Sequence, residues 1–289
     1  PAKPSSARKR NAQHQVAKTD LARLRAVLGA QAFALVSVGE QKGSVPRETG
    51  AWMAVTSEDV IGTIGGGHLE WEAIAHARER LSAPVAGVTQ RHFKLGPSLG
   101  QCCGGALDLL FEHWAADAPT AATQKLLQRL ERPRVPVTLF GGGHVGRAIE
   151  QALRPLPFSL TWVDSRDEIF PADIDPSVAT ENVSPVQDAV ADMMPGSFVL
   201  IMSFSHAEDL DVLLACLTRQ RRQGDLRFIG LIGSATKWAS FSNRARERGF
   251  TDRELAQVTC PIGLPAITGK EPAVIAASVA AQLLGCLRV

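Results

Sequence analysis

A glycine-rich turn between a strand-like and a helix-like segment constrains the fold of this chain more than any other feature. The apolar run 135–140 has the length and composition of a buried parallel strand, and the segment 145–153 is helical by pattern. The turn Gly141–Gly146 reads Gly-Gly-Gly-His-Val-Gly, and a second strand-like run, 158–163, leads to Asp164. Glycines permit a tight turn close to phosphates, and the acid can hold a ribose hydroxyl. This order predicts a dinucleotide-binding βαβ unit of the Rossmann type; the alternative is a strand-to-helix turn that binds nothing.

The remainder of the second half continues to alternate strand-like and helix-like segments, which is typical of a doubly wound parallel sheet. The first half mixes strands and helices without that alternation, which favours an α+β domain. Strands are predicted at 137–140, 158–163, 197–203 and 227–232 in the second half, with a final helix at 271–287, and at 33–38, 51–55, 60–64, 88–95 and 106–113 in the first half, with a polar loop at 39–50.

The length of 289 residues is sufficient for two hydrophobic cores. The first residues are polar and basic and lack the apolar pattern of a folded segment. We therefore expect a disordered basic tail over residues 1–17, an N-terminal α+β domain over 18–117, a linking helix over 118–134 and a C-terminal Rossmann-like domain over 135–289.

The composition argues against several functional classes. The formal net charge of +2 gives no reason to expect a nucleic-acid partner. The five cysteines are odd in number and include no Cys-x-x-Cys pair, so a disulfide framework is not expected. The sequence contains no apolar run long enough to span a bilayer and no signal-peptide segment, so we expect a cytoplasmic protein without a membrane partner.

Polar residues follow the predicted strands of the second half, at the edge where ligands bind in such sheets. Asp164 favours an unphosphorylated ribose, whereas Arg166 could meet a 2′-phosphate, and the sequence leaves both possibilities open. His206 could act as an acid, a base or a metal ligand. The alternative is that Ser205 caps the next helix and that the carboxylates after it interact with the helix dipole.

Further candidates lie at the starts of later helices. Gly233 and Ser234 follow the fourth predicted strand, where a glycine lets a ligand approach and a serine can cap a helix. Lys270 precedes the last helix, whose N-terminus suits an anion. Together these positions favour a ligand that carries phosphate.

Two glycine-rich loops mark the first half. Gly65-Gly66-Gly67-His68 precedes a predicted helix that has Glu70 in its first turn, so its backbone amides could bind an anion. Cys102-Cys103-Gly104 puts two thiols in a loop, where a thiolate could reach a ligand. The two cysteines are too close in sequence for an ordinary tetrahedral zinc site, and structural packing of the thiols is the alternative.

Several longer motifs, taken in order, resemble those of the XdhC/CoxI family, the xanthine dehydrogenase accessory proteins. The resemblance covers the chain from about Leu21 to Leu284. The motifs are Gly43-Ser44-Val45-Pro46-Arg47, Gly65–Glu70, Cys103-Gly104-Gly105, Phe140–Gly146, Trp162–Arg166, Gly230–Ser234, Cys260–Leu264 and Gly269–Ala276. One departure is Phe204, which stands where the family pattern has a histidine before Ser205-His206, and it weakens any two-histidine role there.

The resemblance implies a cytoplasmic chaperone for the molybdenum cofactor (molybdopterin) of xanthine dehydrogenase, without turnover of its own. Such a protein would protect the cofactor, present it for sulfuration by a cysteine desulfurase and deliver it to the molybdenum subunit of the enzyme. The family also implies a homodimer with an XdhC/CoxI domain followed by a Rossmann domain. Cys103 would face the cofactor and could contact molybdenum or its sulfur.

Two alternatives remain from the residues themselves: an NAD(P)-dependent oxidoreductase and a dinucleotide-sensing regulatory protein. A Tyr-x-x-x-Lys catalytic pair is excluded because the chain contains no tyrosine. The candidate cofactor-binding residues, for molybdopterin or for NAD(P) or another nucleotide, are Gly65, Gly66, Gly67, His68, Glu70, Cys102, Cys103, Gly104, Gly141, Gly143, His144, Gly146, Asp164, Arg166, Ser205, His206, Gly233, Ser234 and Lys270.

Overall fold

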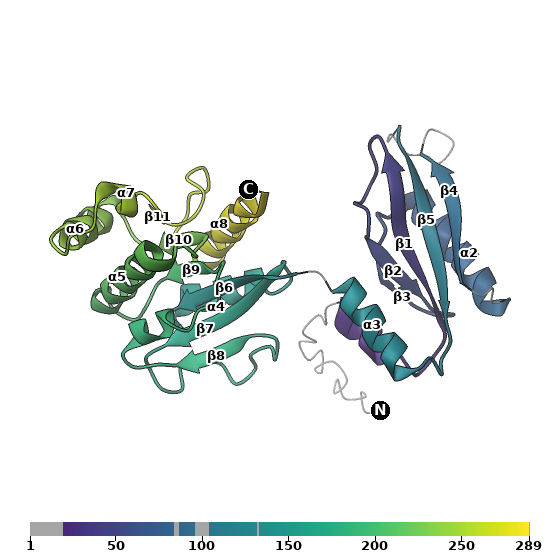
Figure 1. Cartoon of the computed structure of the whole chain (residues 1–289), viewed down its shortest axis with the longest axis horizontal. Coiled ribbons are helices and arrows are strands. Elements are labelled where there is room, and N and C mark those ends of the chain that lie inside the picture. The colour runs from purple at the N-terminus through teal and green to yellow at the C-terminus, as the bar shows by residue number, and fades with distance from the viewer. Residues whose placement is uncertain (1–19, 84–86, 96–103, 132, 289) are drawn as a thin grey trace, which may run out of the picture. The chain divides into compact units, whose positions relative to one another are not determined.

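The structure is a computed structural model that describes residues 20–83, 87–95, 104–131 and 133–288. The chain divides into two compact units, Pro1–Arg132 and Pro133–Val289 (Figure 1). The predicted basic tail, 1–17, lies outside the described residues. In the part of the chain that the structure describes, no helix combines the length and the apolar character needed to cross a membrane.

The first unit contains a five-stranded antiparallel sheet with the strand order β3-β2-β1-β5-β4. Its elements are α1 (Asp20–Val27), β1 (Phe33–Lys42), β2 (Trp52–Val55), β3 (Val60–Gly62), α2 (Gly67–Ser82), β4 (Val88–Lys94), β5 (Ala106–Trp114) and α3 (Thr120–Leu130). This combination of helices and an antiparallel sheet confirms the predicted α+β class.

Helices cover both faces of this sheet because its strands alternate apolar side chains between the two faces. Leu69 and Ala73 of α2 pack in one core cluster with Val36 of β1. Leu24 of α1 and Leu126 of α3 pack in another with the neighbouring strand residues. Helix α3, which lies within the segment 118–134 predicted as a linking helix, is therefore part of the core of the first unit (Figure 1).

Strand β1 is longer than the sequence predicts. The segment 39–50 was expected to be a polar loop, but β1 continues to Lys42. Gln41 pairs with Leu107 and Lys42 with Ala106, after a register shift that follows Val38. Backbone pairing with β5 stabilises this stretch although its side chains are polar, and side-chain pattern alone does not reveal such pairing.

The second unit contains a six-stranded parallel sheet with the order β11-β10-β9-β6-β7-β8. Its elements are β6 (Val135–Phe140), α4 (His144–Leu153), β7 (Phe158–Asp164), β8 (Ala179–Asn182), η2 (Val186–Val190), β9 (Phe198–Ile201), α5 (His206–Gln223), β10 (Phe228–Leu231), α6 (Ala235–Arg246), α7 (Asp252–Leu255), β11 (Val258–Thr259), α8 (Pro272–Gly285) and η3 (Cys286–Arg288). Counted along the unit, the order is 3-2-1-4-5-6 read from β8, the Rossmann topology, and this confirms the predicted fold class.

The central strands of this sheet are buried on both faces. Leu139 of β6 packs with Ile149 of α4 and Val279 of α8 on one face. Phe140 of the same strand packs with Leu213 of α5 on the other face. The strand order reverses between β6 and β9, so the crevice that binds ligands in such sheets lies at the carboxyl ends of these two strands.

Two strands, β8 and β11, were not predicted. All four residues of β8 are exposed at the sheet edge, and β11 is only two residues long. Neither strand has the apolar run from which a strand is recognised in a sequence.

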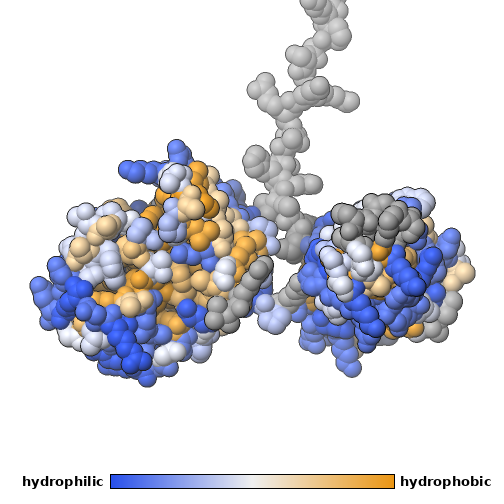
Figure 2. Space-filling view, turned by 90° about the horizontal axis from the view of Figure 1, so that it is seen from above, coloured by the Kyte–Doolittle hydropathy of each residue, from blue (hydrophilic) through white to orange (hydrophobic). Residues whose placement is uncertain are grey.

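On the face seen in Figure 2, apolar side chains gather on the second unit. Its exposed large hydrophobic residues include Met194, Phe204, Leu264 and Ile267.

Candidate functional site

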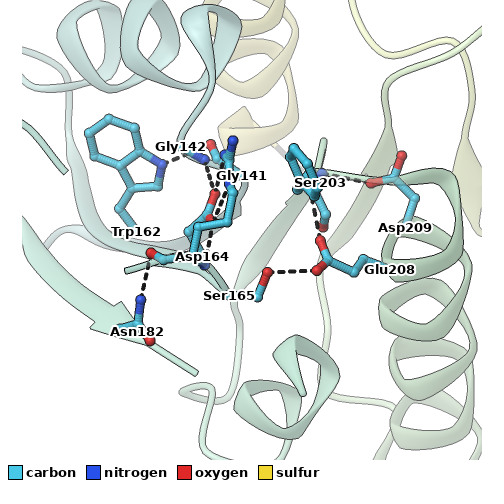
Figure 3. A network of polar contacts seen from close by, with 11 residues as sticks. Gly141, Gly142, Trp162, Asp164, Ser165, Asn182, Ser203, Glu208 and Asp209 are labelled. Carbon is cyan, nitrogen blue, oxygen red and sulfur yellow. Dashed lines mark hydrogen bonds and ion pairs between the residues drawn. The ribbon is translucent and has the colours of Figure 1, made fainter. Parts of the chain in front are cut away.

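The turn between β6 and α4 has no space for side chains at two of its glycines. Gly141 has a φ of 117°, and a Cβ there would lie 1.9 Å from the carbonyl oxygen of Met202. A Cβ on Gly146 would lie 2.0 Å from the carbonyl oxygen of Gly141. The indole Nε1 of Trp162 donates to the same Gly141 oxygen at 2.9 Å (Figure 3). The glycines thus allow the turn to pack against β7 and the end of β9.

The acid at the end of β7 is fully engaged within the protein. The Asp164 carboxylate is 1% exposed. It accepts hydrogen bonds from the Gly142 amide at 2.5 Å, from the Arg166 amide at 2.9 Å, and from Nε and Nη2 of Arg166 at 2.9 and 2.8 Å. Burial raises the pKa of Asp164, but the hydrogen bonds from Arg166 and Gly142 outweigh that effect and hold the pKa below its usual range.

The loops after β7 and β9 contact each other beside this acid. The Arg166 guanidinium lies over the Phe204 ring, 4.6 Å from its centroid. Ser165 Oγ donates to Glu208 Oε1 at 2.6 Å, and the Phe204 amide donates to Glu208 Oε2 at 3.1 Å (Figure 3). We call Asp164, Ser165, Arg166, Phe204 and Glu208 the clasp, because they join these two loops beside the end of β6.

Ser205 and Ser234 act as helix caps. Ser205 Oγ accepts from the Glu208 amide at the start of α5, and Ser234 Oγ accepts from the Lys237 amide at the start of α6, each at 3.2 Å. This favours the capping interpretation of Ser205. His206 is the first residue of α5 and packs edge-on against Phe241, with 6.4 Å between ring centroids.

A buried ion pair lies at the same edge of the sheet. Lys237 Nζ donates to Asp209 Oδ2 at 2.5 Å and to the Ile232 carbonyl at 2.8 Å, and Asp209 Oδ1 accepts from the Ser203 amide. Gly233 leaves space for this lysine, because a Cβ would lie 2.8 Å from Lys237 Cδ. The pair thus connects α5 to α6 at the strand ends.

The remaining candidates of the second unit lie in its turns. Gly143 is the N-cap residue of α4 and His144 its first residue. Lys270 is exposed in the segment before α8. In the described part of the chain, no group of three or more His, Cys, Asp or Glu side chains is placed to hold a metal ion.

The glycine motifs of the first unit meet at one end of its sheet. A Cβ on Gly105 would lie 2.3 Å from the Ser44 carbonyl oxygen, and a Cβ on Gly65 would lie 2.5 Å from Pro46 Cβ. The segment 43–47 therefore packs against both other motifs. We call residues 42–47, 65–70 and 104–105 the glycine junction.

Glu70 shapes the glycine junction from inside. Its Oε2 accepts from Thr63 Oγ1 at 2.5 Å and from the amides of Ile64 and Gly66 at 3.0 Å each. The Gly65 amide donates to Thr63 Oγ1 at 3.1 Å. The amides of Gly65 and Gly66 thus hold the loop, and Gly67 and His68 begin α2.

The outer side of the glycine junction carries polar and open positions. His68 Nε2 lies 3.1 Å from Glu72 Oε1, and its ring stacks on the exposed Trp71. Apart from each glycine itself and its two chain neighbours, no heavy atom of the described residues lies within 4 Å of the position of a Cβ on Gly66 or Gly104. Cys102 and Cys103 lie outside the described residues, and Cys103 directly precedes Gly104 in the sequence.

The predicted site residues therefore form two groups. Among the residues that the structure describes, one group lies at the glycine junction and the other follows the carboxyl ends of the parallel strands, with Lys270 in the segment before α8. Sequence reasoning missed Phe204 as the ring beneath Arg166, and Glu208 as the link between the two loops. Both residues follow β9, the strand that borders the crevice, and that position was the available signal.

Comparison with protein families finds two matches. The family described as "XdhC Rossmann domain" matches residues 137–283, and the one described as "XdhC and CoxI family" matches residues 27–92. The uncharacterized protein YqeB of Escherichia coli (strain K12) is 28% identical over 260 residues, which cover 87% of this chain and 43% of YqeB. The chain thus spans less than half the length of that curated relative.

A solved structure has a similar fold. It is described as the crystal structure of a xanthine dehydrogenase from Bacillus halodurans and is 18% identical to this chain. The two structures superpose with a TM-score of 0.72, over 94% of this chain and 96% of the other. At this identity the similarity shows the fold alone.

Proposed function

The chain belongs to the XdhC and CoxI family, and we propose that it serves in the maturation of xanthine dehydrogenase. In this proposal it binds the molybdenum cofactor, presents it to a cysteine desulfurase for sulfuration, and delivers it to the molybdenum subunit of the enzyme. It acts without turnover of its own and pairs with a second copy of the chain.

The glycine junction is the observation that carries the proposal. Three glycine-containing motifs, distant in sequence, pack together there through contacts that only glycine permits at Gly65 and Gly105. These contacts bring the main chains of the three motifs side by side, so that in the proposal one ligand can meet all three. With respect to the described residues, the junction also has open backbone positions at Gly66 and Gly104.

The residues of the junction suit a phosphate-bearing pterin. Arg47, whose Cγ lies 3.3 Å from the position of a Cβ on Gly65, supplies a cation beside the loop, and His68 supplies a hydrogen-bonding ring in the first turn of α2. In the proposal these two side chains contact the phosphate, because the Glu70 carboxylate already accepts from the amides of Ile64 and Gly66. When bound, the cofactor supplies molybdenum already held by the sulfur atoms of its own pterin, so a three-ligand protein site is not required. In the proposal Cys103 adds a soft thiol donor beside Gly104.

The test is anaerobic binding of molybdopterin cofactor to the purified chain. We expect the wild type to bind one equivalent with a dissociation constant in the micromolar range or below, and Cys103→Ala and Arg47→Gln each to bind at least about tenfold more weakly. Cys286→Ala removes a thiol from the second unit and Arg25→Gln an exposed cation from α1; both should bind as the wild type does.

The outcomes separate the parts of the proposal. Absence of cofactor binding by the wild type contradicts the function itself. Full binding and transfer by Cys103→Ala contradicts the thiol contact, and full binding by Arg47→Gln places the cofactor away from the glycine junction. Equal losses in the variants and in their controls point to general destabilisation instead of a site.

A further inference from the structure

The Rossmann topology of the second unit implies a dinucleotide, and the structure allows a test of whether its residues fit one. In this topology a dinucleotide lies across the crevice at the switch point, here between β6 and β9. Its phosphates lie against the glycine turn, and the acid after the second strand accepts hydrogen bonds from a ribose. The fit therefore depends on Asp164 and on the loops that follow β7 and β9.

Asp164 has no remaining capacity for a ribose. A carboxylate has about four acceptor positions. Four donors approach those of Asp164: the amides of Gly142 and Arg166, and two nitrogens of the Arg166 guanidinium. With the side chain 1% exposed, a ribose hydroxyl could reach the carboxylate only by displacing Arg166.

Arg166 is held in place from its other side as well. Its guanidinium lies 4.6 Å from the centroid of the Phe204 ring. Its carbonyl oxygen accepts from Asn182 Nδ2 of β8 at 2.6 Å. Displacement of the guanidinium would leave the buried Asp164 carboxylate without its cation and would break a cation–π contact at the same time, and each loss costs free energy.

The loop after β7 also packs against the glycine turn at Gly142. A Cβ on Gly142 would lie 2.6 Å from Ile169 Cγ1, so the Ile169 side chain lies directly against the turn. Ser165 and Phe204 are both bonded to the Glu208 carboxylate, which ties this loop to the start of α5. The two loops that border the crevice are thus joined to each other.

A 2′-phosphorylated dinucleotide fits no better. Arg166 is the cation that such a phosphate would need, but its guanidinium already forms a two-point ion pair with Asp164. A phosphate that approached it would also approach the Asp164 carboxylate and would be repelled.

We propose that the clasp makes this Rossmann domain exclude dinucleotides, with Arg166 in place of the ribose and Phe204 holding Arg166 there. Arg166 and Phe204 are then the residues that determine ligand specificity at this edge of the sheet. The inference is independent of molybdopterin binding at the glycine junction. It also counts against both alternatives, the oxidoreductase and the dinucleotide sensor.

Calorimetric titration of the full chain with NAD⁺, NADP⁺ and ADP-ribose tests this inference. The wild type should bind each ligand with a dissociation constant weaker than about 1 mM. The double variant Arg166→Ala/Phe204→Ala should gain at least about tenfold in affinity for ADP-ribose, because the two guanidinium donors on Asp164 and the ring that holds the guanidinium are both removed. Arg244→Ala, which removes an exposed cation from α6, should behave as the wild type does.

Folding of the variants is checked by circular dichroism. Phe204 is 65% exposed, so Phe204→Ala leaves the Arg166–Asp164 ion pair in place and serves as the second variant if the double variant does not fold. Its gain in affinity should be smaller than that of the double variant, because Arg166 still has to be displaced from Asp164 but no longer has the ring contact that holds it there. Micromolar binding of any of the three ligands by the wild type overturns the inference. So does a folded variant, without the clasp, that binds no more tightly than the wild type.

Discussion

At the scale of single residues, the glycine turn of the second unit combines positions that differ sharply in what they tolerate. Gly141 has a positive φ and contacts the end of β9, whereas Gly143, two residues later, has φ −72° and ψ −175°, an extended conformation open to any residue. Two glycines of one motif therefore have different physical roles. The first allows close packing, and the second leaves the start of α4 uncovered.

Substitution of these two glycines should separate the roles. Gly141→Ala should lower the free energy of unfolding by more than about 2 kcal/mol, since its methyl group would overlap the Met202 carbonyl and the backbone is strained for alanine. Gly143→Ala is the matched control and should change it by less than about 0.5 kcal/mol. Urea unfolding followed by circular dichroism measures both. Equal effects would contradict the close approach at Gly141.

At the scale of elements, a single arginine connects helix α5 to the turn after η2. Arg219 is 8% exposed and donates to the carbonyl oxygens of Val190, Ala191 and Met193 at 2.7, 3.1 and 2.7 Å. It also forms a two-point ion pair with Asp225. The hydrogen bonds from Arg219 lower the pKa of Asp225. The turn after η2 has no regular secondary structure, and the Arg219 guanidinium supplies hydrogen bonds to its carbonyl groups that backbone amides would supply in a helix or sheet.

Removal of this connection should be costly. Arg219→Met keeps much of the side-chain volume but leaves three carbonyl groups and Asp225 without their partner, so we expect a loss of about 3 kcal/mol. Arg222→Met, at an exposed position in the last turn of the same helix, should be nearly neutral. Urea unfolding together with hydrogen exchange at residues 186–193 provides the measurement.

The same pair predicts a pH dependence. A carboxyl whose folded pKa is lowered contributes stability that is complete above its unfolded pKa and is lost as the pH falls through the folded value. The difference between wild type and Arg219→Met should therefore be constant above about pH 4 and narrow below it. A difference that widens in acid would show that Asp225 is not the partner that matters.

Also at the scale of elements, the strands and the turn that have a local pattern of apolar residues or glycines could be predicted from the sequence. Strands β6, β7, β9 and β10 have apolar runs, and the glycine turn has a fixed spacing to Asp164. The sequence did not predict β8, which has no buried residue, or the extension of β1, which depends on pairing with β5. The contacts of the clasp and of the glycine junction could not be predicted from the sequence either. Each joins residues far apart in sequence through side-chain rotamers and loop paths that no local spacing specifies.

At the scale of the whole molecule, each unit has core clusters of its own. The clusters of the first unit draw on α1, α2, α3 and its antiparallel sheet, and those of the second on its parallel sheet and the helices around it. Such independent cores are the property that allows a domain to fold alone. The proposed cofactor binding at the glycine junction and the proposed specificity of the clasp can therefore be studied separately.

A fragment of residues 133–289 should fold by itself. We expect the fragment to show the circular dichroism of a folded α/β domain, and its amides to be protected from hydrogen exchange as the same amides are in the full chain. Calorimetry of the full chain should resolve two unfolding transitions. The fragment 20–131 is the complementary control for the first unit. An unfolded fragment 133–289 would contradict the independence of the two cores.

The clasp also has a consequence for the way in which enzymatic functions are assigned to proteins from their sequences. A search pattern made of a strand, a glycine turn, a helix and a second strand that ends in an acidic residue identifies this chain as a dinucleotide-binding protein. In our proposal Arg166, two positions after the acid, and the Phe204 ring, which follows β9, reverse that assignment. A pattern that also examined those two positions would separate redox enzymes from scaffolds that have kept the fold while occupying its ligand crevice with their own side chains.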